Sequence, residues 1–419
     1  MAPLWGIVAG LLVSAAGVGV VFGDGFPWAS RWQSTLIAGV HCLVLGVVAQ
    51  TMIGALYQVL PVLGGRLIGG GLTGGRTVMW LLNLGLLCLV GGLTTSIGLF
   101  WVACLTFLPV SLLIFSISAL RAAKPESQWS GSLLAVRCSL LSLVFVLLLG
   151  ALQVSGYSAM LWPAYALDRH LTDIHLLWGV GGWIGLLVMG VSYQVVPMFH
   201  VTPALAAQRQ KIYPLLIMAS LLLTSVVWWL FPDSMLATWA RWLNVFAFLG
   251  YVGELARALK QRKRKLEDAS VKAWWTGIGS YLGFIVVLAA RDAGLMWLWP
   301  LEWVTHLELA AGGMLIFGTI LAVVLGMQLK ILPFLSYLHM QRACGSDFSK
   351  IKSLPSTRDI LPEIFSLGLV KLHWLNLSLI ILMIFYFELA ILAGLGMLAE
   401  FGLLAFSTHR VLRLLKRHI

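Results

Sequence analysis

Residues 41–61 read H-C-L-V-L-G-V-V-A-Q-T-M-I-G-A-L-Y-Q-V-L-P, an uncharged run that opens with a histidine and ends with a proline. A helix of this length, at 1.5 Å per residue, crosses the roughly 30 Å hydrocarbon core of a bilayer. Within lipid every backbone polar group must be satisfied internally, which restricts a spanning segment to a helix or a closed barrel. This stretch therefore predicts a membrane-spanning helix.

Similar apolar runs recur along the whole chain. Of its 419 residues, 60% are hydrophobic and 11% are charged, and the mean hydropathy is +0.94. A soluble domain carries about 25% charged residues, and the alternating pattern of a membrane barrel is absent from the sequence. We predict an all-α polytopic membrane protein with about twelve transmembrane helices, the first centred near Ala15 and the eighth near Phe248. The first run lacks a charged start, which favours a retained helix over a cleaved signal peptide.

Basic residues indicate the orientation in the membrane. They gather in the connections after even-numbered predicted spans and in the C-terminal tail, where they are Arg410, Arg413, Lys416 and Arg417. Such residues stay on the cytoplasmic side, so both termini are predicted there. Basic loops beside anionic lipid also account for the net charge of +12. The lipid bilayer is thus the expected partner and nucleic acid is not, although the basic run at 260–265 leaves an acidic partner as an alternative.

One short phrase occurs three times, and the third copy is the weakest. It reads G-A-L-Y-Q-V-L-P at 54–61, G-V-S-Y-Q-V-V-P at 190–197 and G-M-Q-L-K-I-L-P at 326–333, so each copy follows the last by 136 residues. The same interval separates Gly46, Gly182 and Gly318. Such a period is the signature of an internal structural repeat. We predict one transmembrane domain, 1–419, built as three pseudo-repeated four-helix arcs: 360–419 with 1–65, 75–200, and 210–335.

The repeated residue types have a structural explanation. Small residues let membrane helices approach closely, and a proline removes one helical hydrogen bond, which kinks or ends the helix. The repeat is therefore expected to define the architecture rather than the chemistry.

Candidate chemistry lies at the opposite ends of the repeated spans, which begin with His41, His175 and His306. Neutral imidazole is a common ligand of haem iron and copper, and polar residues at membrane depth are candidate functional groups. The alternative for each is a histidine at headgroup level, hydrogen-bonded to water. The sequence has no C-x-x-C-H motif, so a covalently attached haem is not expected.

The stretch 41–61 resembles a haem-ligand helix of the catalytic subunit of haem–copper oxidases, above all of the C-type branch that oxidises cytochrome c. Residues 175–197 are similar to the sixth helix of that subunit, which supplies a copper-ligand histidine. NnrS-like haem- and copper-containing membrane proteins are a related alternative. The resemblance implies twelve core helices in three arcs, haem b as cofactor, a redox partner or companion membrane subunit, and location in a bacterial cytoplasmic membrane.

The family pattern assigns roles to the three histidines. It makes His41 and His306 the axial ligands of one haem and His175 a copper ligand. The predicted seventh span, about 212–230, lacks the further histidines of the copper site, and one imidazole holds copper poorly. His41 precedes its proline by 20 residues and His306 by 27, which sets His306 about 10 Å farther out. His175 and His306 therefore remain competing partners for His41.

Three functional hypotheses follow. The first is a haem-binding membrane protein that acts in electron transfer or in nitric oxide, haem or copper handling. The second is an oxidoreductase, an atypical terminal oxidase or nitric oxide reductase, that uses His175 and Tyr193. The third is a cofactor-free transporter or assembly protein on the same scaffold.

Other polar residues of the predicted spans are secondary candidates. Glu308 is expected to bond an imidazole or a haem propionate, and Arg291 is a candidate to meet a propionate. Glu388 and Glu400, in the last two predicted spans, are candidates for a proton path or for salt bridges inside the bundle. His373 is expected near the inner end of a span.

Overall fold

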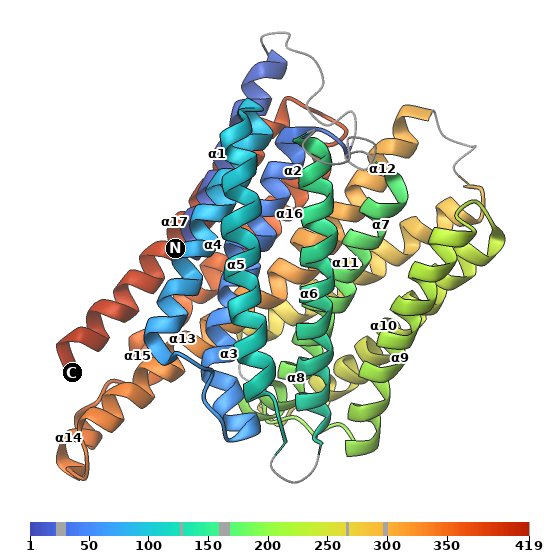
Figure 1. Cartoon of the computed structure of the whole chain (residues 1–419). Helices are drawn as coiled ribbons and strands as arrows, with labels where there is room; N and C mark the ends of the chain where they lie inside the picture. The colour runs from blue at the N-terminus through green and yellow to red at the C-terminus, as the bar shows by residue number, and fades with distance from the viewer. Residues whose placement is uncertain (22–30, 126–128, 159–167, 265–267, 296–300, 419) are drawn as a thin grey trace. The chain divides into compact units, whose positions relative to one another are not determined.

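The computed structural model describes residues 1–21, 31–125, 129–158, 168–264, 268–295 and 301–418 (Figure 1). Lys265, the last residue of the basic run, lies outside these ranges. All regular structure within them is helical. Eleven of the described helices are long and apolar enough to cross a membrane. The chain is thus an all-α polytopic membrane protein, as predicted.

The eighth predicted span differs from the other eleven in hydropathy. It forms α10, Met235–Lys260, whose 26 residues are long enough to cross a bilayer, but it is not among the candidate spans of the described chain. Arg241 and Asn244 interrupt its apolar run. The Asn244 side chain is buried and donates to the Thr224 hydroxyl at 2.5 Å, so this polar residue holds α10 against α9, Ala207–Leu230.

The described helices fall into two compact units. Unit 1 combines residues 1–51 with 266–419, and unit 2 comprises residues 52–265. The helices of unit 1 are α1 (Ala2–Val21), α2 (Ser34–His41), η1 (Cys42–Ala49), α11 (Ala269–Asp292), α12 (Leu301–Gly313), η5 (Met314–Leu321), α13 (Ala322–Ala343), α14 (Phe348–Ser353), α15 (Thr357–Ile360), α16 (Glu363–Leu382) and α17 (Leu389–His418). Those of unit 2 are α4 (Gly71–Thr95), α5 (Gly98–Ala122), α6 (Gly131–Tyr157), α7 (Arg169–Leu177), η3 (Trp178–Gly185), α8 (Leu186–His200), α9 and α10. Helix α3 (Gln50–Gly64) begins in unit 1 and continues into unit 2.

Glycines bring the first and last helices of unit 1 together. A Cβ added to Gly10 of α1 would lie 2.9 Å from the carbonyl oxygen of Gly394 of α17, and one added to Gly17 would lie 2.7 Å from the backbone nitrogen of Ile391. Since the position in α17 falls as the position in α1 rises, the two helices are antiparallel. Close backbone approach at small residues is how membrane helices associate without a hydrophobic driving force.

Three π-helical segments stand at the same interval as the repeated phrase. They begin at Cys42, Trp178 and Met314, each eight residues long and each starting 136 residues after the one before. The glycine in each has a neighbouring side chain against it: a Cβ would meet Trp5 at Gly46, Ser142 at Gly182 and Ser280 at Gly318. The repeated glycine thus permits close packing inside a π-helix, while the arrangement in three four-helix arcs remains a prediction.

The three repeated prolines all lie inside helices. Pro61 is in α3 and Pro197 is in α8, and each helix ends three residues later, at Gly64 and His200. Pro333 is in α13, which continues to Ala343. The proline therefore precedes a helix end in two copies and is accommodated in the helix interior in the third.

Candidate functional site

His41 is the last residue of α2 and directly precedes the π-helix η1. Its Nδ1 lies 2.8 Å from the carbonyl oxygen of Ile37. Because a carbonyl only accepts, Nδ1 carries the hydrogen, and in the neutral ring Nε2 holds the lone pair that a metal needs. The exposed His339 makes the same contact with Leu335 at 2.8 Å, so this contact alone does not identify a ligand. What distinguishes His41 is the π-helix, since such segments concentrate at functional sites.

His306 lies in α12 among aromatic rings of unit 1. Its ring centroid is 5.6 Å from that of Phe385 and 5.9 Å from that of Phe387, both at steep angles. Trp303 packs on Phe385 at 5.5 Å. The two phenylalanines belong to the connection between α16 and α17, so His306 lies at the membrane-edge end of the bundle rather than at its middle.

A hydrogen bond fixes the relative register of the helices that carry His41 and His306. Gln328 of α13 donates to the hydroxyl of Thr51 at 2.6 Å, and η1 and η5 are also in contact. His41 precedes Thr51 by 10 residues, whereas His306 precedes Gln328 by 22. The difference corresponds to about 18 Å along the helix axis. Axial ligands of one iron bind opposite faces of the same ring, so this register does not fit His41 and His306 as such a pair.

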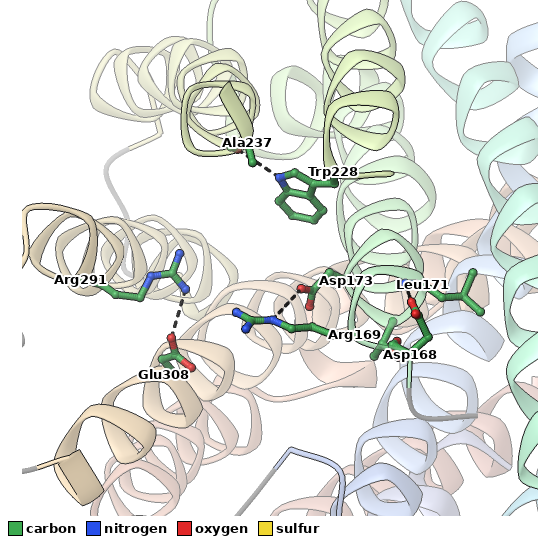
Figure 2. A network of polar contacts seen from close by, with 9 residues as sticks. Asp168, Arg169, Leu171, Asp173, Trp228, Ala237, Arg291 and Glu308 are labelled. Atoms are coloured by element: carbon green, nitrogen blue, oxygen red, sulfur yellow. Dashed lines mark hydrogen bonds and ion pairs between the residues drawn. The ribbon is translucent and has the colours of Figure 1, made fainter. Parts of the chain in front are cut away.

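His175 lies in α7 of unit 2, three residues before the start of the π-helix η3 at Trp178. The Asp168 side chain caps α7 by accepting from the Leu171 backbone N–H at 2.7 Å, as Figure 2 shows. On α6, Gly150 leaves room for the imidazole, because an added Cβ would lie 3.2 Å from His175 Cε1. The sequence-predicted histidine is thus held by a capped helix and a facing glycine.

Tyr193, the other residue of the oxidase hypothesis, is buried in α8. Its ring packs edge-on against Tyr251 at 6.1 Å. The Tyr251 and Ser192 hydroxyls are 2.6 Å apart. These contacts make Tyr193 part of the contact between α8 and α10.

Glu308 forms an ion pair at the end of α11, and its expected bond to a haem propionate stays a prediction. Its carboxylate pairs with the Arg291 guanidinium at 3.2 Å (Figure 2), and Arg291 also contacts Asp292 at 3.1 Å. Glu308 is 48% exposed. An exposed Arg–Glu pair at the end of α11 is an ordinary interfacial ion pair that contributes little to the stability of the fold.

A buried polar cluster joins α16 to α17. The sequence predicted His373 near the inner end of a span, but His373 lies in the middle of α16. There its Nδ1 is 2.7 Å from Glu400 Oε1. Asn376 donates to the other carboxylate oxygen at 2.5 Å. We call these three residues the His–Glu–Asn cluster. The sequence signal for it was a histidine and an asparagine three residues apart on one helix face, followed by a glutamate in the next apolar run.

Comparison with known sequences gives no independent assignment. Across the described residues, no group of three or more His, Cys, Asp or Glu side chains is arranged to hold a metal ion. No protein-family model matches the chain, and no curated protein matches it.

Proposed function

We propose that this chain is a haem-binding integral membrane protein of the haem–copper oxidase superfamily. It acts in electron transfer or in nitric oxide, haem or copper handling, in a bacterial cytoplasmic membrane with both termini in the cytoplasm. A redox partner or a companion membrane subunit exchanges electrons with it.

The observation that carries this proposal is the setting of His41. The Ile37 carbonyl holds its Nδ1–H, so the ring is oriented with Nε2 as the ligating nitrogen. The π-helix η1 follows at once. A haem bound through Nε2 supplies one-electron redox chemistry, with a potential set by ligands and burial.

The other two histidines have separate roles in the proposal. The register of Thr51 and Gln328 argues against His306 as the second axial ligand of the iron at His41. His306 and His175 remain candidate ligands in their own right. Copper at His175 is the weaker assignment, because a single imidazole does not hold copper against competing sites.

The decisive experiment is a reduced-minus-oxidised visible spectrum with a pyridine haemochrome count on full-length protein produced under haem-replete conditions. We expect a b-type haem signal in the wild type and its loss in His41→Ala. His339→Ala is the matched control, because His339 makes the same backbone contact on an exposed helix face. Its spectrum is expected to equal that of the wild type.

Two other outcomes would replace the proposal. A protein free of haem under these conditions would favour a cofactor-free transporter or assembly protein. Stoichiometric copper together with oxygen or nitric oxide turnover would favour an atypical terminal oxidase or nitric oxide reductase. The proposed topology has its own test. A reporter that is active only in the periplasm should be inactive when it is fused to the C-terminus.

A further inference from the structure

The His–Glu–Asn cluster is buried completely within unit 1. His373 is 4% exposed, while Asn376 and Glu400 are each 0% exposed. Both oxygens of the Glu400 carboxyl group have a partner, His373 Nδ1 at 2.7 Å and the Asn376 amide at 2.5 Å. Two polar atoms of the cluster, His373 Nε2 and Asn376 Oδ1, are buried without a hydrogen-bond partner among the described residues.

The cluster lies at the middle of the helices that carry it. His373 follows the start of α16 by 10 residues and precedes its end by nine, which places it about 15 Å from either end. The hydrocarbon core of a bilayer is about 30 Å thick. An ionisable pair at this depth is expensive, and such pairs mark ion and proton sites in membrane proteins.

The hydrogen bond between His373 and Glu400 needs only the one hydrogen on Nδ1, but a pair without net charge needs a second proton. With Nδ1–H donating to an ionised Glu400, the pair carries one buried negative charge, which is costly in a low-dielectric interior. One added proton makes the pair neutral, either as imidazolium with carboxylate or as imidazole with carboxylic acid. Because the Asn376 amide donates to Oε2, the hydrogen of the carboxylic acid form lies on Oε1 and is donated to Nδ1, so His373 Nε2 carries a hydrogen in both neutral forms.

Within the described part of the chain, Glu400 makes no ion pair with a lysine or an arginine. The Phe317 ring stacks on the His373 imidazole at 4.7 Å and 5°. On the elements packed against α16 and α17, Lys330 pairs with Asp268 and Arg291 pairs with Asp292 and Glu308. The other ionisable residues on those elements are Lys272 and Tyr281 on α11, Glu302 and His306 on α12, Tyr337, His339 and Arg342 on α13, and Arg358 and Asp359 on α15. Helix α16 itself also carries Glu363 and Lys371, and α17 carries His409, Arg410, Arg413, Lys416, Arg417 and His418. Helices α1 and η5 carry none.

We propose that His373 and Glu400 form a proton-binding site at the middle of the membrane-spanning helices, with one exchangeable proton reported by His373 Nε2. In the binding step a hydronium ion gives its proton to the pair and leaves as water, and the pair changes from one negative charge to neutral. Asn376 is a positioning residue, which orients the carboxylate through Oε2. The site is independent of haem, since none of its residues belongs to the proposed haem ligands.

The test is solid-state nitrogen-15 NMR of histidine-labelled full-length protein in nanodiscs. The His373 signals can be identified by a through-space contact with labelled phenylalanine ring carbons that is lost in Phe317→Leu, because His306 also packs on Phe385 and Phe387. We expect Nε2 to carry a hydrogen in the neutral pair and to lose it reversibly as the pH rises. An Nε2 that stays unprotonated, or one that stays protonated to the highest pH at which the protein is folded, would overturn the proposal.

Variants separate a proton site from a merely structural contact. Glu400→Gln removes the negative charge but keeps an oxygen for Nδ1–H, so Nε2 should be unprotonated at the pH at which the wild type is protonated. The matched control is Glu388→Gln, because Glu388 is exposed just before α17, and it should leave the Nε2 titration unchanged. If Glu400→Gln does not fold, the wild-type titration decides. A haem-free protein that shows the titration would support this site and reject only the haem proposal.

Discussion

The side chain of Gln328 donates to the hydroxyl of Thr51 at 2.6 Å, and that hydroxyl donates in turn to the Val47 carbonyl at 2.7 Å. This chain of bonds ties α13 to the start of α3 and to the π-helix before it. Because the surrounding helices are apolar, Gln328 and Thr51 have few other polar groups to which they could bond. These bonds fix the separation of His41 and His306 along the helix axes.

Removal of this bond should loosen the contact between the two helices. In a double-mutant cycle with Gln328→Leu and Thr51→Val, we expect a coupling energy of about 0.6 kcal/mol and at most about 1.7 kcal/mol. The measurement is reversible unfolding in mixed micelles. Thr106→Val is the control for losing an intrahelical threonine bond, since Thr106 donates only to Val102, at 2.9 Å. A coupling energy of zero would contradict the register described above.

The repeated glycines should differ in their tolerance of alanine. A Cβ at Gly182 would lie 2.8 Å from both Cβ and Oγ of Ser142, so Gly182→Ala is expected to cost about 1–3 kcal/mol through overpacking. At Gly54 no described atom lies within 4 Å of the added Cβ. There alanine should stabilise α3 by up to about 1 kcal/mol, because it favours the helix over glycine. Thermal unfolding of both variants decides, and equal effects would contradict the packing.

Lys330 replaces the glutamine of the other two copies, and its ammonium lies 2.6 Å from Asp268 Oδ2. Asp268 is 8% exposed and also accepts from the Ser270 backbone N–H at 2.9 Å, which caps α11. Lys330→Gln should cost about 1–3 kcal/mol, because it removes the Lys330 cation from a buried carboxylate. Adding Asp268→Asn should recover part of the loss. If the single variant unfolds at the same temperature as the wild type, the ion pair contributes nothing.

The connection between α13 and α16 should loosen in acid. The pKa of Asp359 lies below its ordinary value because its carboxylate accepts from the Ser356 hydroxyl and then from the Ser356 backbone N–H. A carboxyl group with a lowered folded pKa stabilises the fold above its unfolded pKa, and this contribution is lost as the pH falls through the folded value. Hydrogen exchange of residues 356–360, corrected for its intrinsic pH dependence, should therefore accelerate below about the ordinary value of 3.8.

Asp359→Asn provides the control for this pH dependence. The variant should exchange faster than the wild type near neutral pH and show no further acceleration on acidification. Asp347 is the matched second site, since the Ser349 hydroxyl and then the Lys350 backbone N–H lower the pKa of its carboxyl group. Its helix, α14, should respond to acid in the same direction. An unchanged exchange rate at both sites would contradict the capping role.

The sequence was sufficient for the features that depend on local composition. Apolar runs predict the membrane helices, and the period of 136 residues predicts that Gly46, Gly182 and Gly318 share one packing role. The π-helices were not predictable, because they arise from a shift of backbone hydrogen bonds that no residue type specifies. The pairing of His373 with Glu400 also required the structure, since the two residues are 27 positions apart on different helices, which must first pack. The contact of α10 with α9 through Asn244 and Thr224 was likewise not predictable from the sequence.

The discontinuity of unit 1 has a consequence for how the protein is made. Helix α1 leaves the ribosome well before α17, against which its glycines pack. At 5–20 residues per second, roughly 20–75 s separate their synthesis. During that time the small-residue face of α1 must be covered by lipid, by a chaperone or by a provisional helix neighbour. Unit 2 is continuous in sequence, so its assembly can be complete before α17 is made and joins unit 1.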